Sequence, residues 1–142
     1  MSEQNTQEAN KALIRRWFEE VWNKGRAEAI AEMMSEDCVN HGLSEDDEPL
    51  RGAAGFLPFH AQFREAFPQI EVVVEDALAE DDRVAVRCSV RGKHVGDSLG
   101  FKATGTMAEF DGIAIGRVKD GMFVETWNNF DFMRMYKQLG AI

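Results

Sequence analysis

The sequence has no long hydrophobic run, and no apolar stretch approaches the ~20 residues that a membrane-spanning helix needs. Residues 1–10 are polar and have neither the basic start nor the apolar stretch of a signal peptide. We therefore expect a cytoplasmic protein that makes no contact with a membrane.

Cysteine and histidine are scarce, with two and three residues respectively. Cys38 and Cys88 lie far apart and form no C-x-x-C pair, whereas a structural zinc site usually needs four Cys or His ligands in close pairs. The sequence therefore predicts no metal site, and we interpret the two cysteines as buried, reduced thiols.

Basic residues are also few, because 16 Lys and Arg stand against 25 Asp and Glu, which gives a net charge of −9. A surface with this charge repels the phosphate groups of nucleic acids and of anionic membranes. The charge balance therefore argues against a general nucleic-acid-binding function.

What remains is the composition of a globular protein, with 44% hydrophobic and 29% charged residues in a chain of 142. A chain of this size fits one domain and buries about 68–70% of the surface that its unfolded form exposes. We predict a single domain over residues 1–142, with residues 1–8 disordered.

Hydrophobic residues recur at helical spacing in three segments. In the first, Leu13, Trp17 and Val21 share one face, and Gly25 follows as a helix stop. Pro68 ends the third, because the residue before a proline avoids the helical region. We predict helices over residues 9–22, 26–34 and 53–67.

Further along the chain, hydrophobic residues alternate with polar ones, as in half-buried strands. Val86, Cys88 and Val90, for example, alternate with charged or polar residues, and Asp120-Gly121 is a strong hairpin signal. We predict a short extended piece over residues 38–41, an acidic loop over 42–52, strands over 70–79, 84–91, 106–119 and 122–129, and a last helix over 130–139.

Helices that come first and antiparallel strands that come later predict an α+β fold. We expect a cone-shaped barrel, in which a curved mixed or antiparallel sheet wraps around the N-terminal helices. The cone is open at one end, and a pocket for a small-molecule ligand is expected there, near the acidic loop.

Several short strings together resemble one known family. They are Leu13-Ile14-Arg15-Arg16 through Asn23-Lys24-Gly25, Arg91-Gly92-Lys93-His94-Val95-Gly96, Gly100 to Gly105, Arg117-Val118-Lys119-Asp120-Gly121 and Gln138-Leu139-Gly140. The chain is similar over nearly its whole length to SnoaL-like proteins, the polyketide cyclase branch of the nuclear-transport-factor-like superfamily. The resemblance implies a cone-shaped α+β barrel, a dimer or higher homo-oligomer, and ring closure in a hydrophobic pocket without a metal or organic cofactor.

The resemblance also implies site residues. Counted back from the closing Gln138-Leu139-Gly140, the family's catalytic aspartate falls on Asn128 and its assisting histidine on Ala114, while Trp22 and Phe59 match residues that line the pocket. An amide cannot take a proton from carbon at neutral pH, but it can donate a hydrogen bond to an enolate or carbonyl oxygen. We therefore keep Asn128 as a candidate catalytic residue in the role of a donor.

Alternation along the last two strands predicts which residues face the pocket. Val124 shares a face with Asn128, and Gly112, Ala114 and Gly116 share a face on the strand opposite. We expect Ala114 and Val124 to contact substrate, and the small side chains to leave room for it. The alternatives are that the amide satisfies backbone groups near the strand end and that the small residues allow close packing of a helix against the sheet.

Three further residues are candidate acids or bases. Asp131 precedes the last helix, where a helix N-cap is the more ordinary role. His41 follows the first extended piece, and His60 lies among Phe56 and Phe63 on the third helix. Histidine is the commonest general acid or base, yet a single histidine among phenylalanines is more often a core residue.

Phe123 and Trp127 are predicted to lie on the outer face of the last strand, opposite Asn128. Exposed aromatic residues on so charged a protein indicate an interface. The family resemblance implies that a second copy of the chain binds this face. Taken together, the sequence predicts a pocket protein that acts on a polyketide-like or ring-bearing apolar molecule as a cofactor-free cyclase, isomerase or lyase. The alternative is a ligand-binding or dimerisation domain that has lost the catalytic acid.

Overall fold

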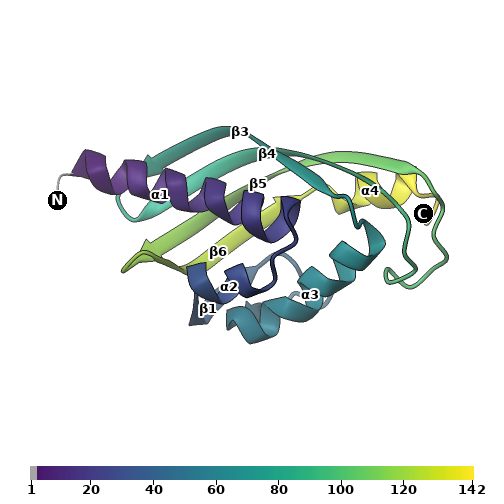
Figure 1. The fold of residues 1–142 in the computed structure, drawn as a ribbon, viewed down its shortest axis with the longest axis horizontal. Helices are drawn as coiled ribbons and strands as arrows, with labels where there is room; N and C mark the ends of the chain where they lie inside the picture. Colours follow the sequence, from purple (N-terminus) through teal and green to yellow (C-terminus); the bar gives the residue numbers. More distant parts are fainter. Residues whose placement is uncertain (1–2) are drawn as a thin grey trace.

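The computed structural model describes residues 3–142, with side chains from Asn5 onward. It is a mixed six-stranded sheet with helices on one side, in which the strand order is β2-β1-β6-β5-β4-β3 (Figure 1). The elements are α1 (Glu3–Trp17), the π-helical turn η1 (Phe18–Asn23), α2 (Glu28–Met33), β1 (Met34–His41), β2 (Leu50–Arg51), α3 (Gly52–Ala66), β3 (Glu71–Glu80), β4 (Arg83–Lys93), β5 (Met107–Lys119), β6 (Met122–Phe130) and α4 (Phe132–Gln138).

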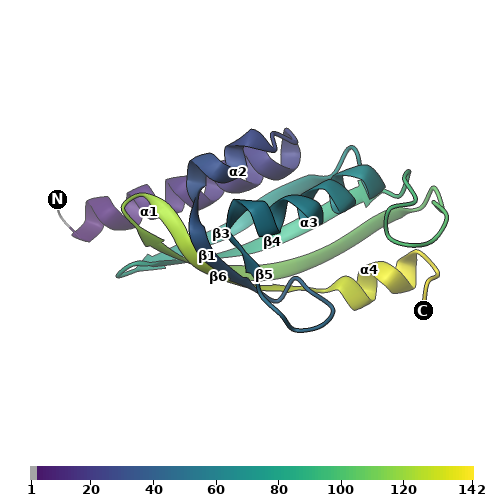
Figure 2. The ribbon, with the colours of Figure 1, turned by 90° about the horizontal axis from the view of Figure 1, so that it is seen from below.

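The predicted α+β class is confirmed, and the sheet is curled rather than closed into a barrel. Helices α1, α2 and α3 lie on the same side of the sheet, and α4 lies at the end remote from the N-terminus (Figure 2). Only β1 and β6 pair in parallel, and the other neighbours are antiparallel.

The first predicted helix differs from the structure at both ends. It begins at Glu3, so residues 3–8, which we expected to be disordered, are helical, while residues 1–2 lie outside the described residues. It ends at Trp17, because the chain widens into η1, where the N–H of Lys24 donates to the carbonyl of Glu19 at 2.9 Å. This turn buries Phe18, Val21 and Trp22.

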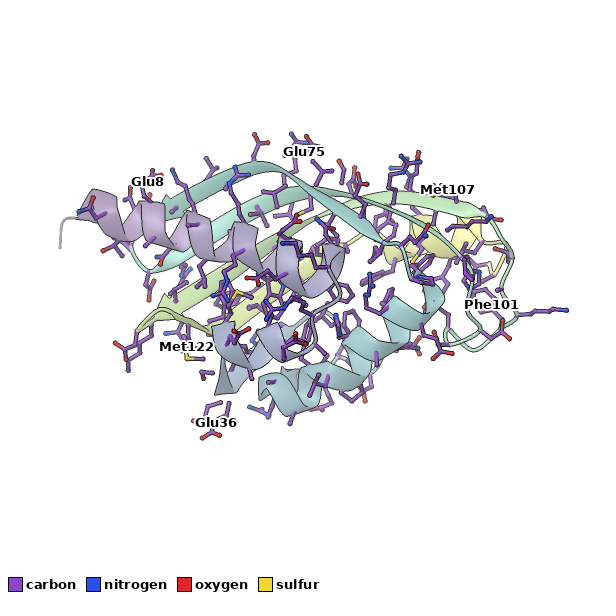
Figure 3. The ribbon with its side chains drawn as sticks, viewed as in Figure 1. Glu8, Glu36, Glu75, Phe101, Met107 and Met122 are labelled. Atoms are coloured by element: carbon purple, nitrogen blue, oxygen red, sulfur yellow. The ribbon has the colours of Figure 1, made fainter. Side chains whose placement is uncertain are left out.

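The core fills the space between the helices and the inner face of the sheet (Figure 3). Glu75 on β3 is exposed and points away from it. Aromatic rings hold the layers together: Trp17 of α1 packs edge-on against Phe56 of α3 at 5.2 Å and against Phe123 of β6 at 5.9 Å between ring centroids. Such pairs add about 0.5–1.5 kcal/mol each beyond the area that they bury.

A β-bulge in β6 overturns the predicted alternation of that strand. Arg117 pairs with Glu125 and Val118 with Phe123, so Val124 is an extra residue without a partner on β5. An extra residue reverses the faces of everything before it. Phe123 is therefore only 2% exposed and points into the core, and its predicted place on the outer face beside Trp127 is wrong.

A second error concerns the small residues of β5. A Cβ added to Gly112 would lie 2.3 Å from the ring of Phe130, and one added to Gly116 would lie 2.6 Å from the ring of Phe123. The glycines therefore make room for two phenylalanines of the neighbouring strand rather than for a ligand. The packing is therefore against side chains of β6 and not, as the alternative held, of a helix against the sheet.

Candidate functional site

A narrow cavity of about 80 Å³ lies between the helices and the inner face of the sheet. Its walls are aromatic and aliphatic. Trp17, Phe18 and Trp22 contribute from α1 and η1, Phe56, Phe59 and Phe63 from α3, and Phe110, Ala114, Phe123, Phe130 and Phe132 from β5, β6 and the start of α4. Among the residues that the structure describes, no Asp, Glu, His, Lys or Arg lines this cavity.

Of the lining side chains in the described part of the chain, three carry an amide or a hydroxyl group, and they lie on adjacent parallel strands. Asn40 of β1 is paired with Thr126 of β6, and Asn128 follows two residues later on the same face. The hydroxyl of Thr126 is 2.6 Å from Oδ1 of Asn40, and Nδ2 of Asn128 is 3.1 Å from the Thr126 hydroxyl oxygen. The three side chains form one continuous hydrogen-bonded row along the cavity wall.

The same row is tied to the backbone at both ends. Nδ2 of Asn40 donates to the carbonyl of Leu50 on β2 at 3.1 Å, and Nδ2 of Asn128 donates to the carbonyl of His41 on β1 at 2.9 Å. Asn40 is 1% exposed, so its polar atoms depend on these partners for hydrogen bonds. The row therefore holds the β2, β1 and β6 strands in fixed positions beside the cavity.

Asn128 and Ala114, the two positions that the family resemblance gave for the catalytic pair, face each other directly. They are register partners on β6 and β5, and both line the cavity. Neither side chain can exchange a proton near neutral pH. The position is as expected from the sequence, and the cavity wall at this point is an amide opposite a methyl group.

His60 is buried in the core and does not line the cavity. Its Nε2 lies 2.7 Å from the carbonyl oxygen of Val21, and its ring packs on Trp22 at 5.0 Å. Burial lowers the pKa of His60, the bond to Val21 acts in the opposite direction, and nearby Arg64 lowers the pKa further. A neutral imidazole that donates to Val21 joins α3 to η1, so the structure gives His60 the role of a core residue.

His41 lies with its ring on the outer face of the sheet, away from the cavity. Its Nε2 is 2.8 Å from a carboxylate oxygen of Glu125, and its ring stacks on Trp127 at 5.8 Å. The hydrogen bond from His41, together with Arg117 at 3.0 Å, holds the pKa of Glu125 below its usual value. His41 thus contributes its backbone carbonyl to the row of polar groups and its imidazole to a surface cluster.

Asp131 caps the last helix, as the simpler interpretation of the sequence held. Its carboxylate accepts a hydrogen bond from the backbone N–H of Arg134 at 3.0 Å. It is exposed, although its neighbours Phe130 and Phe132 line the cavity.

Three of the four predicted substrate-contacting residues line the cavity, and the bulge in β6 removes the fourth. Trp22, Phe59 and Ala114 line the cavity, whereas Val124, the extra residue of the bulge, does not. Sequence reasoning missed Asn40. Its signal was present, because alternation places Asn40 on the same face as the apolar Cys38, and a polar side chain on an apolar face needs a partner.

Both cysteines are buried and free, as expected. Burial raises the pKa of the Cys38 thiol to about 12, with a smaller contribution from Glu125, and burial raises that of Cys88 to about 12 as well. Thiols with such pKa values are not nucleophiles at neutral pH. Within residues 3–142, moreover, no group of three His, Cys, Asp or Glu side chains could hold a metal ion, and no helix has the length and apolar character needed to cross a membrane.

Comparison with known proteins agrees with this architecture. A family model described as SnoaL-like polyketide cyclase matches residues 12–139. The aklanonic acid methyl ester cyclase DnrD of Streptomyces peucetius is 30% identical over 130 residues, which cover 90% of this chain and 88% of DnrD. The corresponding cyclase DauD of Streptomyces sp. (strain C5) is also 30% identical, over 90% of this chain and 80% of its own length.

Solved structures show the same fold. A structure assigned as a SnoaL-like polyketide cyclase from Jannaschia sp. CCS1 superposes with a TM-score of 0.88 at 24% identity, covering 100% of this chain and 99% of that one. IdmH from Streptomyces antibioticus, assigned as a polyketide cyclase, superposes with a TM-score of 0.78 at 31% identity, covering 91% of this chain and 96% of IdmH.

Proposed function

Because this chain belongs to the SnoaL-like polyketide cyclase family, we propose that it binds a largely apolar, ring-bearing, polyketide-like molecule and promotes its cyclisation or isomerisation without a metal or organic cofactor. The aromatic cavity carries the proposal, since flat ring systems pack well against Trp17, Trp22 and Phe59. The two relatives named as cyclases of a polyketide ester support the same substrate class.

The chemistry follows from what the cavity holds and lacks. No ionisable side chain among the described residues lines it, so the cavity itself supplies no base. A carbon between two carbonyl groups exchanges its proton through solvent to give the neutral enol, whose carbon can attack a third carbonyl to close a ring. The enol O–H proton is released to solvent as the bond forms, and solvent returns a proton to the new alkoxide. The protein contributes by folding the substrate so that the two carbons meet, and orientation of this kind can accelerate a reaction strongly.

The size of the cavity sets a condition on this function. Its volume of about 80 Å³ is below the ~300–1,000 Å³ of ordinary ligand sites. A fused-ring molecule therefore enters only if lining side chains move. Leu43, Phe59 and Phe132 are partly exposed and line the cavity, so they are the side chains that we expect to swing outward.

A second candidate function is ligand binding without turnover. The specific observation in its favour is the pair of Asn128 and Ala114, which puts no acid or base at the positions where the family resemblance implies them. A carrier or sensor needs the aromatic walls and the polar row but not the proton transfer.

A ring-closure assay in solution distinguishes the cyclase function from ligand binding without turnover. Aklanonic acid methyl ester, the substrate named for the relatives, is incubated with and without protein, and the cyclised isomer is followed by chromatography. We expect faster closure with protein and a return to the buffer rate in Ala114→Phe, which fills the cavity, but not in Ile113→Phe, whose side chain lies on the outer face and is 52% exposed in the parent. Saturable binding with no change in rate would support the carrier instead.

A further inference from the structure

In the polar row formed by Asn40, Thr126 and Asn128, each hydrogen bond has a fixed donor and acceptor. The inference drawn from this rests on the proposed function and specifies the ligand. We propose that Asn128 is a specificity-determining residue that offers only an acceptor, its Oδ1 atom, to the ligand. The molecule that fits is uncharged and presents a hydroxyl or enol O–H group at this point of the cavity.

The direction is set first at Asn40. A backbone carbonyl can only accept, so the atom of Asn40 that lies 3.1 Å from the carbonyl of Leu50 must be the amide nitrogen. Its other contact, with the sulfur of Met34 at 3.5 Å, uses the second N–H. Oδ1 of Asn40 is then the acceptor that faces Thr126, and the single proton of the Thr126 hydroxyl is directed to it at 2.6 Å.

The direction is set again, independently, at Asn128. Nδ2 of Asn128 lies 2.9 Å from the carbonyl of His41, and a flipped amide would place two oxygen atoms against each other there. The Thr126 hydroxyl has already given its proton to Asn40, so it accepts the second N–H of Asn128 at 3.1 Å. Both ends of the row therefore require the same orientation.

One polar atom of the row is left for the ligand. Every N–H and O–H proton of Asn40, Thr126 and Asn128 is directed to a protein acceptor, and Oδ1 of Asn128 has no donor among the described residues. Asn128 is half-buried and lines the cavity. The donor role that the sequence suggested for Asn128 is thus taken up by the backbone of β1, and the cavity sees an acceptor.

The same geometry disfavours an anionic ligand. No lining side chain of the described residues carries a positive charge, and an acceptor oxygen repels a carboxylate. The segment that follows the lining residue Leu43 adds Glu45, Asp46, Asp47 and Glu48, all exposed. A site built to bind a hydroxyl also discriminates against an analogue that lacks it, because the buried acceptor is then left unpaired.

Three naphthalenes of similar shape test this inference on the unmodified protein by titration calorimetry: 2-naphthol, 2-methoxynaphthalene and 2-naphthoate. We expect 2-naphthol to bind about three- to ten-fold more tightly than its methyl ether, as one hydrogen bond to a partly buried acceptor predicts. Naphthoate, which is ionised at neutral pH, should bind most weakly.

Variants locate the effect. In Asn128→Leu the difference between 2-naphthol and its ether should disappear, whereas Asn129→Leu, on the adjacent exposed position, should keep it. Thr126→Val removes the acceptor for one Asn128 proton and frees that proton for the cavity, so binding of the ether should improve. A merely structural role of Thr126 predicts no such gain.

The outcomes separate the two proposals. Equal affinity of the unmodified protein for 2-naphthol and 2-methoxynaphthalene, or preference for naphthoate, overturns the assignment of Asn128 and leaves the proposed function standing. Failure of both neutral probes to bind overturns both proposals.

Discussion

The side-chain amide of Asn128 donates a hydrogen bond to the backbone carbonyl of His41 at 2.9 Å. Two residues that the sequence marked as candidate catalytic groups therefore meet, but through the main chain of one of them. The imidazole of His41 is occupied with Glu125 on the other face of the sheet. The cavity wall at this point is therefore held by hydrogen bonds, and it presents no side chain that can act as a general acid or base.

Replacing the amide by an acid tests that description. In Asn128→Asp, the carboxyl group lies in an apolar cavity and faces the carbonyl of His41, to which only its protonated form can donate. Burial and this contact both favour the neutral form, so its pKa should rise above the ~3.9 of a free aspartate. NMR titration measures it, with Asn129→Asp as the exposed control.

The stability of Asn128→Asp should depend on pH in the same sense. The folded variant holds the new proton more tightly than the unfolded chain does, so its stability relative to the parent is highest below pH ~3.9 and falls as the pH rises through the folded-state pKa. A folded-state pKa higher by one than that of the unfolded chain corresponds to about 1.36 kcal/mol of lost stability. Urea denaturation at several pH values shows this, and equal pH profiles for Asn128→Asp and Asn129→Asp would contradict it.

His60 should make the protein acid-sensitive. Burial lowers its pKa in the folded state, so the unfolded chain binds a proton that the folded protein does not. Stability is then fully present above the unfolded pKa of about 6.5 and declines as the pH falls below it.

The comparison with His60→Gln isolates this contribution. Glutamine can still donate to the carbonyl of Val21 but does not titrate, so the variant should lose about 0.5–1.5 kcal/mol at most at pH 8 and show a flatter decline toward pH 5. Denaturation curves at the two pH values provide the measurement. A decline as steep as that of the parent would assign the acid sensitivity to other groups.

The outer face of the sheet is expected to bind a second copy of the chain, although without Phe123. Ile113 and Ile115 on β5 are 52% and 36% exposed and lie beside Trp127 on β6. Arg117 and Glu125 flank them, and a face with both signs of charge can complement itself across a two-fold axis.

Sedimentation of the unmodified protein and of Ile113→Glu at micromolar concentration checks this interface. A charge placed between two apolar surfaces is costly, so the variant should be a monomer where the parent is a dimer. Met133→Glu, at an exposed methionine of α4, should not change the assembly. A monomeric parent would contradict the interface.

The order and type of the longer elements could be predicted from the sequence because periodicity survives local irregularity, whereas the two-residue strand β2 lies within the predicted acidic loop. The helical spacing around Trp17 and the alternation around Cys88 gave the right elements, and the Asp120-Gly121 turn has positive φ at both residues, as its hairpin requires. The hairpin predicted that Ala114 lies opposite Asn128, and the register confirms this.

The errors came from features that the periodicity of hydrophobic residues does not reveal. One extra residue, Val124, reversed the face of Phe123, whose ring then filled the space above Gly116. Independently of the bulge, the ring of Phe130 fills the space above Gly112. The direction of the polar row was equally hidden, because it depends on Leu50 and His41, whose carbonyls approach Asn40 and Asn128 only in the folded chain.

The central claim, that the aromatic cavity is a ligand site, is tested most directly by tryptophan fluorescence. Trp17 and Trp22 line the cavity and Trp127 does not, so Trp127→Phe leaves both remaining indoles at the site. Titration of this variant with a neutral hydroxyanthraquinone should quench its fluorescence saturably, and the added substitution Ala114→Phe should abolish the quenching. Quenching that never saturates, or that persists with Ala114→Phe, would contradict the account.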